Sequence, residues 1–182
     1  MAPSITRREA LGGAAAALVI ASCGGGDPAP GGGPRPGSGA ALLGSLLALE
    51  HAVVAAYAAC DEVLRGEALR NARAIEERER RHVTRLQGLI RGLGGDPPSG
   101  RSPEEYARTF PRLRTGRDAL RFAEDLEQRQ LRAYLEAVAE LPDLGLRSAA
   151  AEIAAEEGEH LGTVRVLQGL PAAEGPFVTG AL

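Results

Sequence analysis

The chain has 182 residues, enough for one domain with its own core, and carries a formal net charge of -3. Arginine and glutamate alternate rather than cluster, and the chain has no Trp and only 3 Phe. These features exclude a basic stripe or an aromatic platform for nucleic acid, so no nucleic-acid partner is expected. Beyond a Gly- and Pro-rich beginning, strong helix formers dominate and hairpin signals are missing, which predicts an all-α domain.

The amino-terminal segment has the pattern of an export signal. Paired arginines at Arg7-Arg8 precede an apolar run over 10–21, which is too short to span a bilayer but fits the apolar region of a signal peptide. The arginine pair resembles a twin-arginine signal, and Ile20-Ala21-Ser22-Cys23 resembles a bacterial lipobox. The resemblance implies cleavage before Cys23 and lipid attachment to its thiol. The competing interpretation makes Cys23 a small residue near a generic cleavage site.

Four regions follow from this pattern. We expect a lipoprotein signal peptide over 1–22, a Gly- and Pro-rich tether over 23–39, a helical domain over 40–170 and a tail over 171–182. The mature protein would be exported. It would be anchored through lipidated Cys23 to the outer face of the cytoplasmic membrane, or would lie in the periplasm. Cys60 is then the only cysteine of the mature domain, so no internal disulfide is expected and Cys60 is predicted to be a small core residue.

The helical domain divides at its glycines and prolines. Helices are predicted at about 40–65, 67–93, 115–141 and 143–169, with Gly66 closing the first one. Tight turns join the first pair and the second pair. About twenty residues separate the two pairs, including a short helix predicted over 103–110 with Ser102 as its cap. Two helical hairpins joined by one long crossover are the topology of the ferritin-like four-helix bundle.

The inward-facing stripe of each predicted helix is apolar at both ends and polar in the middle. A buried carboxylate without a partner costs several kcal/mol, and no Arg lies on the stripes to pair with these. Two divalent metal ions would balance four carboxylates, and two neutral imidazoles would complete their ligands. The candidate metal ligands are Glu50, Glu79, His82, Glu127, Glu157 and His160.

The polar residues occur as a repeat. Each half of the domain supplies a lone glutamate with a tyrosine seven residues later, and then a Glu-x-x-His pair on one helix face. Over 40–170 this pattern resembles the ferritin-like superfamily, in its rubrerythrin-type form. The resemblance implies that the same six residues bind two metal ions and that Glu79 and Glu157 bridge them. The chain has no cysteine pairs for a rubredoxin-like iron site, so an external electron donor, unknown from the sequence, is expected.

Other residues near the stripes have less certain roles. Tyr57 and Tyr134 have two interpretations, as core residues or as partners that orient a ligand carboxylate or supply an electron. Glu124 lies on the stripe one turn before Glu127, and we expect it where the bundle opens to solvent rather than on a path for ions. Glu156 is predicted to face elsewhere and serves as an alternative ligand, and His51 is predicted at the surface.

Three functions are compatible with this sequence. The first is a di-iron centre, with two Fe ions, that oxidises Fe(II) or reduces oxygen or peroxide. The second is a centre with two Mn ions that dismutates peroxide, and the third is a bundle that binds metal for structure or delivery without catalysis. A homodimer is compatible with the sequence. A closed storage cage is disfavoured, because a lipid anchor and a long tether do not suit a closed shell.

Overall fold

The computed structural model describes residues 38–173, all within the compact unit Gly33–Leu182. Its helices are α1 (Ser38–Asp61), α2 (Gly66–Gly92), α3 (Pro103–Ala107), α4 (Gly116–Glu140) and α5 (Leu144–Leu167), with no strand in the described range. The all-α prediction is therefore confirmed. The predicted signal peptide, Cys23 and most of the tether lie outside the described residues.

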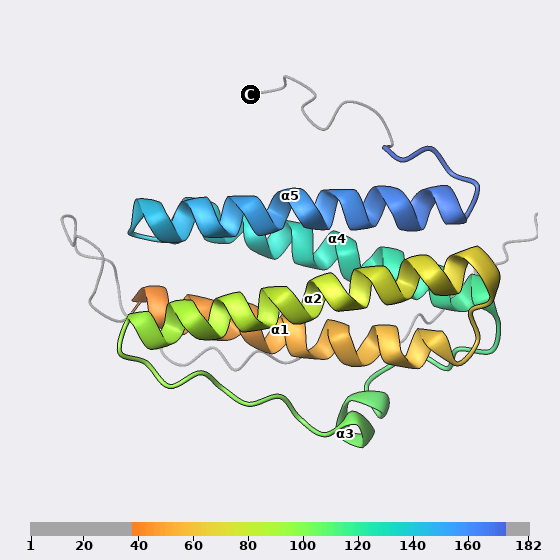
Figure 1. Ribbon diagram of the computed structural model, residues 1–182, viewed down its shortest axis with the longest axis horizontal. Helices are drawn as coiled ribbons and strands as arrows, with labels where there is room; N and C mark the ends of the chain where they lie inside the picture. Colours follow the sequence, from red (N-terminus) through yellow and green to blue (C-terminus); the bar gives the residue numbers. More distant parts are fainter. Residues whose placement is uncertain (1–37, 174–182) are drawn as a thin grey trace, which may run out of the picture. The chain divides into compact units, whose positions relative to one another are not determined.

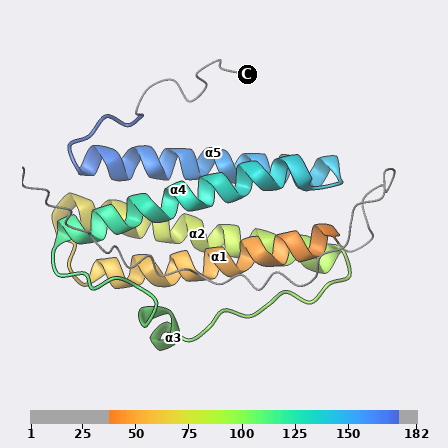
Figure 2. The same ribbon diagram turned by 180° about the vertical axis from the view of Figure 1, so that it is seen from behind.

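The four long helices form a bundle of two antiparallel hairpins (Figure 1). Helix α1 packs most extensively on α2, and α4 on α5, while α1 with α4 and α2 with α5 close the bundle. The view from behind shows the long crossover and α3 on the side of α1 (Figure 2). This is the predicted ferritin-like topology, in which inward side chains of four helices meet at one depth.

Short local motifs fix where α3, α4 and α5 begin. Thr115 and Asp118 form a capping box at the start of α4, with the Asp118 N–H donating to Thr115 Oγ1 over 3.2 Å and the Thr115 N–H donating to Asp118 Oδ2 over 2.9 Å. Ser102 caps α3, as predicted, and Asp143 caps α5. These capping side chains accept hydrogen bonds from backbone N–H groups that the first turn of a helix leaves unpaired.

Two helix boundaries differ from their predictions. Helix α3 ends at Ala107 rather than at residue 110. Helix α1 ends at Asp61 rather than near residue 65, and the Leu64 N–H donates to the Cys60 carbonyl over 3.0 Å in the turn that follows. Gly66, predicted to close the first helix, instead begins α2 with a φ of 59°. Glycine adopts this left-handed conformation without the steric cost that a Cβ would add.

Two apolar clusters fill the bundle, one on each side of its polar middle. Leu43, Leu47 and Leu141 belong to one cluster, and Val53 and Cys60 belong to the other. Cys60 is buried, which confirms its prediction as a core residue. The polar middle is therefore shielded from water along the bundle axis.

Helix α1 is also long and apolar enough to cross a membrane, with a mean hydropathy of 1.7 over Gly39–Asp61. In the structure it packs against α2 and α4, and it brings Glu50 to the buried middle of the bundle. The test concerns length and composition only, and a core helix can also meet it; 39% of the apolar window is buried inside the bundle.

Candidate metal centre

All six predicted ligands meet in the polar middle of the bundle. The four glutamates have no exposed surface, and His82 and His160 are 3% and 1% exposed. Each long helix contributes: Glu50 comes from α1, and Glu127 from α4. The two Glu-x-x-His pairs come from α2 and α5, where a spacing of three residues puts both side chains on one helix face.

The six residues form two groups of four whose candidate ligand atoms lie within 4.8 Å of one another. We name these groups position 1 and position 2. Position 1 consists of Glu50, Glu79, His82 and Glu157, and position 2 consists of Glu79, Glu127, Glu157 and His160. The two positions share two carboxylates, one from α2 and one from α5.

The shared carboxylates each turn one oxygen toward each histidine. Glu79 places Oε2 3.5 Å from His82 Nδ1 and Oε1 2.9 Å from His160 Nδ1. Glu157 places Oε1 3.1 Å from His82 Nδ1 and Oε2 3.3 Å from His160 Nδ1. By contrast, each lone glutamate lies near one histidine only. Glu79 and Glu157 thus belong to both positions, and we call Glu50 and Glu127, which belong to one position each, the terminal carboxylates.

The two tyrosines hold the terminal carboxylates crosswise between hairpins. Tyr57 of α1 donates its hydroxyl to Glu127 Oε1 on α4, and Tyr134 of α4 donates to Glu50 Oε1 on α1. Both rings are buried in the core. Burial, and then the nearby carboxylate, raises the pKa of each hydroxyl well above 10, so both tyrosines remain donors. Each tyrosine is thus a core residue that also orients a terminal carboxylate.

Gln130 belongs to the centre but was not predicted from the sequence. It is fully buried, and its Nε2 lies 3.1 Å from Glu50 Oε2, 3.0 Å from Glu79 Oε2 and 3.4 Å from Glu157 Oε1. One signal could have found it: Gln130 follows Glu127 by three residues, the same spacing as in the Glu-x-x-His pairs.

Proton sharing balances the charge of the metal-free centre. Burial, reinforced by the charge of Glu79, raises the pKa of Glu50 well above its ordinary value. Burial is also the main cause that raises the pKa of Glu127 to about 8. Burial acts to raise the pKa of Glu79 too, but hydrogen bonds with His160 and His82 outweigh it, so that pKa falls below its ordinary value. Near neutral pH these shifts favour the protonated form of Glu50 and Glu127 and the ionised form of Glu79.

The histidines complete this balance. Burial acts to lower the pKa of both imidazoles, but their contacts with carboxylates outweigh it. Contacts with Glu157 and Glu79 raise the pKa of His82 to about 9. Contacts with Glu127, and then with Glu157 and Glu79, raise the pKa of His160 to about 12. Protons on the imidazoles thus supply positive charge that divalent ions would supply in their place.

The unpaired atoms of the centre fit a two-metal site. Buried oxygens without a hydrogen-bond partner include Glu127 Oε2 and Gln130 Oε1. An unpaired polar atom in the core costs free energy, and a metal ion would take up such lone pairs. Carboxylate oxygens with imidazole nitrogens are a donor set suited to iron or manganese.

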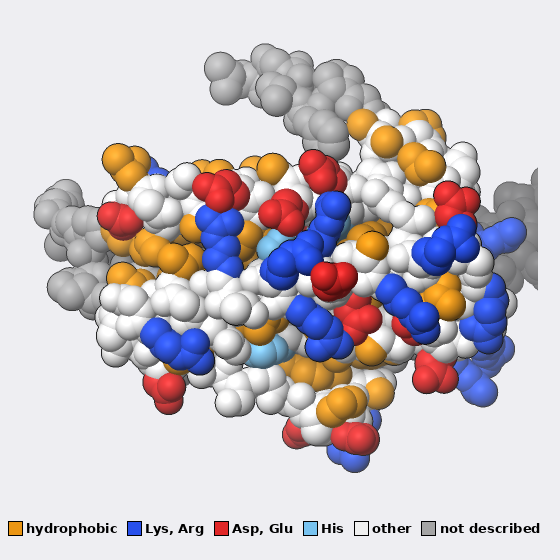
Figure 3. All heavy atoms as spheres, in the orientation of Figure 1, with side chains coloured by type: hydrophobic (Ala, Val, Ile, Leu, Met, Phe, Trp, Pro, Cys, Tyr) orange, Lys and Arg blue, Asp and Glu red, His pale blue; other side chains and the backbone are white. Residues whose placement is uncertain are grey.

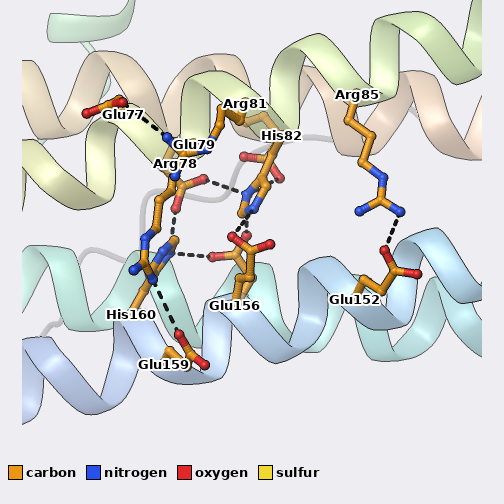
Figure 4. A network of polar contacts seen from close by, with 12 residues as sticks. Glu77, Arg78, Glu79, Arg81, His82, Arg85, Glu152, Glu156, Glu159 and His160 are labelled. Carbon is orange, nitrogen blue, oxygen red and sulfur yellow. Dashed lines mark hydrogen bonds and ion pairs between the residues drawn. The ribbon is translucent and has the colours of Figure 1, made fainter.

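Arginine–glutamate pairs cover the centre on the face formed by α2 and α5 (Figure 3). Arg78 Nη1 lies 3.3 Å from Glu159 Oε2, and Arg85 Nη2 lies 2.5 Å from Glu152 Oε2 (Figure 4). Between these pairs, Glu156 contacts the outer nitrogen of His82. Glu156 thus lies outside the six-residue centre, as predicted, but it contacts one of the candidate ligands.

Two neighbouring residues have contacts that were not predicted. Glu124 is half-buried and lines a surface pocket, in keeping with its predicted place, and its carboxylate is paired: Oε1 lies 2.6 Å from Arg165 Nη1, and Oε2 accepts from Gln168 Nε2 over 2.7 Å. Arg165 is only 4% exposed, and it projects from outside the predicted stripe of α5. His51, predicted at the surface, is half-buried, since the crossover passes so close that a Cβ on Gly100 would lie 3.1 Å from its ring.

The fold and the buried carboxylate and histidine cluster define a ferritin-like bundle with a cluster suited to metal binding. The chain belongs to the family described as the ferritin-like domain, whose model matches residues 38–170. No curated protein matches the chain.

Two solved structures share this fold. A conserved hypothetical protein from Mycobacterium tuberculosis has a TM-score of 0.66 at 18% identity, covering 78% of this chain and 99% of its own. The bacterioferritin of Desulfovibrio desulfuricans, described with a diiron site, has a TM-score of 0.59 at 20% identity, covering 81% of this chain and 96% of its own. At these identities the likeness concerns the fold alone.

Proposed function

We propose that this protein is an exported di-iron carboxylate protein that oxidises Fe(II) or reduces oxygen or peroxide. The observation that carries the proposal is the pair of shared carboxylates: Glu79 and Glu157 each present one oxygen to each histidine. Carboxylates that only stabilised the apolar core would not need this two-sided arrangement. The diiron site described for the bacterioferritin of similar fold supports iron as the metal.

Two iron ions at positions 1 and 2 would supply two electrons, enough with two protons to convert one peroxide into two waters. The residues of the chain bind and orient. Glu79 and Glu157 would hold the ions at a fixed separation, and the terminal carboxylates would hold one ion each. Tyr57 and Tyr134 keep protons beside the terminal carboxylates, and the apolar clusters on both sides exclude bulk water.

The cellular location is part of the proposal. Arg7-Arg8 and Cys23 support export and lipid attachment, so the centre would work at the outer face of the cytoplasmic membrane or in the periplasm. Twin-arginine export carries folded proteins, which suits a bundle that must acquire its metal inside the cell. The electron donor would be an external molecule.

The decisive experiment begins with the metal-free full chain, titrated anaerobically with Fe(II). We expect about two iron ions per chain, as in other two-metal sites, with a rise in the thermal midpoint because the ligand binds only the folded state. Stopped-flow mixing with oxygen or with peroxide then measures oxidation. Glu79→Ala and Glu157→Ala should each lose both ions, whereas exposed Glu136→Ala on α4 should behave like the parent.

The outcomes separate the competing functions. If the parent binds Mn(II) and dismutates peroxide but oxidises no Fe(II), the di-manganese function replaces the di-iron one. If it binds metal but supports no reaction, a structural or delivery role replaces the enzyme. A parent that binds neither metal, with an unchanged thermal midpoint, would refute the proposal altogether.

A further inference from the structure

The internal repeat of the bundle is broken at one buried position. Gln130 follows Glu127 by three residues, and Val53 follows Glu50 by the same spacing, so the two occupy equivalent places on α4 and α1. Both side chains are fully buried. An amide can donate two hydrogen bonds, whereas Val53 can donate none. The two halves of the bundle therefore differ here: one half has the polar Gln130, and the other has the apolar Val53.

Gln130 contacts only oxygens that belong to position 1. Its Nε2 lies near Glu50 Oε2, and also near Glu79 Oε2 and Glu157 Oε1. The last two are the oxygens that face His82, the histidine of position 1. No contact joins Gln130 to Glu127 or to the oxygens that face His160 among the described residues. One amide thus gathers three of the four residues of position 1.

The terminal carboxylates are consequently held to different degrees. Glu50 is fixed at both oxygens, since Oε1 accepts from Tyr134 and Oε2 accepts from Gln130. Glu127 is fixed at one oxygen only: Oε1 accepts from Tyr57, while Oε2 is buried without a hydrogen-bond partner. A carboxylate that accepts a hydrogen bond at one oxygen can still rotate about that hydrogen bond, whereas a carboxylate that accepts at both oxygens cannot. The terminal ligand of position 2 is the adjustable one.

The histidines differ in the same direction. His82 places Nε2 3.3 Å from Glu156 Oε2, so a carboxylate orients its ring from outside (Figure 4). His160 Nε2 is buried without a hydrogen-bond partner. The place on α2 equivalent to Glu156 holds Arg78, which pairs with Glu159 instead. Partners that orient metal ligands typically change metal affinity about 10- to 100-fold when they are removed.

We infer that the two metal positions are unequal: position 1, organised by Gln130 and Glu156, binds its ion first and more tightly, and position 2 binds second. This inference rests on the proposed two-metal function. Gln130 and Glu156 are positioning residues, because they act through Glu50 and His82 respectively. The consequence is a centre with one firmly held ion beside one adjustable position.

The test uses Co(II) as the probe, with its visible absorption and binding curve measured on the metal-free full chain. His160→Ala removes the imidazole of position 2 and keeps that of position 1. His82→Ala removes the imidazole of position 1 and keeps that of position 2. We expect His160→Ala to bind Co(II) at least about tenfold more tightly than His82→Ala, the usual effect of ligand-orienting partners. If the two variants bind Co(II) with equal affinity, or if His82→Ala binds it more tightly, the inference is overturned. This comparison needs no substitution at Gln130.

A second pair of variants assigns the difference to Gln130. Gln130→Met keeps the length of the side chain but donates no hydrogen bond. In the His160→Ala background it should weaken Co(II) binding about tenfold and alter the Co(II) spectrum, and in the His82→Ala background it should change binding less than about twofold. An equal loss in both backgrounds would mean that Gln130 only supports the fold, and would overturn its positioning role.

Glu156 has a matched control in exposed Glu159. Glu156→Gln should weaken position 1 selectively, and Glu159→Gln should leave both positions unchanged. A parent that binds no Co(II), Fe(II) or Mn(II) refutes the proposed function and this inference together. A parent that binds two ions with equal affinities refutes only the inequality of the positions.

Discussion

Replacing Glu127 with glutamine should stabilise the metal-free protein, by an amount that grows with pH. Glu127 is fully buried, and its pKa is raised from 4.5 to about 8, mainly by burial. Above pH 4.5 the unfolded chain ionises this carboxyl, whereas the folded chain keeps it protonated. Stability from this group is therefore present at low pH and is lost as pH rises from 4.5 toward 8.

The size of the effect follows from that difference in pKa. Folding at pH 7 must return a proton to a group with an unfolded pKa of 4.5, which costs about 3 kcal/mol at roughly 1.36 kcal/mol per pH unit. At pH 5 the same cost is below about 1 kcal/mol. Glutamine resembles the protonated carboxyl and its Oε1 can still accept from Tyr57, but it takes up no proton. Glu127→Gln should thus gain up to about 3 kcal/mol at pH 7.

Thermal unfolding of the metal-free protein at pH 5 and at pH 8 measures this effect. The midpoint of Glu127→Gln should exceed that of the parent by roughly 8–16 °C at pH 8, where the same pKa difference costs about 4 kcal/mol, and by much less at pH 5. The control Glu136→Gln changes an exposed glutamate on the same helix, and should shift stability by no more than about 0.5 kcal/mol. A gain that is the same at both pH values, or a loss at pH 8, would refute the account of buried protonation.

Three further changes test other parts of the molecule. Arg165→Ala leaves Glu124 without its buried partner, and should lower the free energy of unfolding, measured by chemical denaturation, by about 3 kcal/mol. Arg78→Ala breaks an exposed pair and should lower it by less than about 1 kcal/mol. Similar losses in the two variants would contradict the argument that burial sets the cost. Thr115→Ala removes the capping box of α4 and should lower the free energy of unfolding by about 1 kcal/mol, which Thr115→Ser should largely restore. Cys23→Ala should abolish metabolic labelling with fatty acid, and a labelled Cys23→Ala protein would exclude the anchor.

The six candidate ligands could be found from the sequence because ionisable residues on an apolar stripe are rare and costly. Glu50 and Glu127 stand among leucines and alanines at helical spacing, and their repeat with Tyr57 and Tyr134 made chance unlikely. Periodicity therefore gave both the bundle and the depth of the centre. What it could not give was which neutral residues share that depth.

Gln130 and Arg165 show this limit. Gln128 and Gln130 stand two residues apart in a polar stretch, and only the rotation of α4 in the bundle exposes one and buries the other. Arg165 is the one buried arginine among the described residues, most of whose arginines are exposed, and its partner Glu124 lies on another helix. Gly66 was misjudged for a local reason, because a glycine next to a turn can end one helix or begin the next. Contacts between helices, rather than patterns within one, decide all three positions.

Tyr57 and Tyr134 make each helical hairpin depend on the other. The α1–α2 hairpin supplies the tyrosine that holds Glu127 of the other hairpin, and the α4–α5 hairpin supplies the tyrosine that holds Glu50. Neither hairpin can orient its own terminal carboxylate. The centre is accordingly a property of an association between two half-sites, and the crossover acts as a linker that sets their effective concentration. Cutting the chain within the crossover would convert the assembly of the centre from an intramolecular step into a concentration-dependent one.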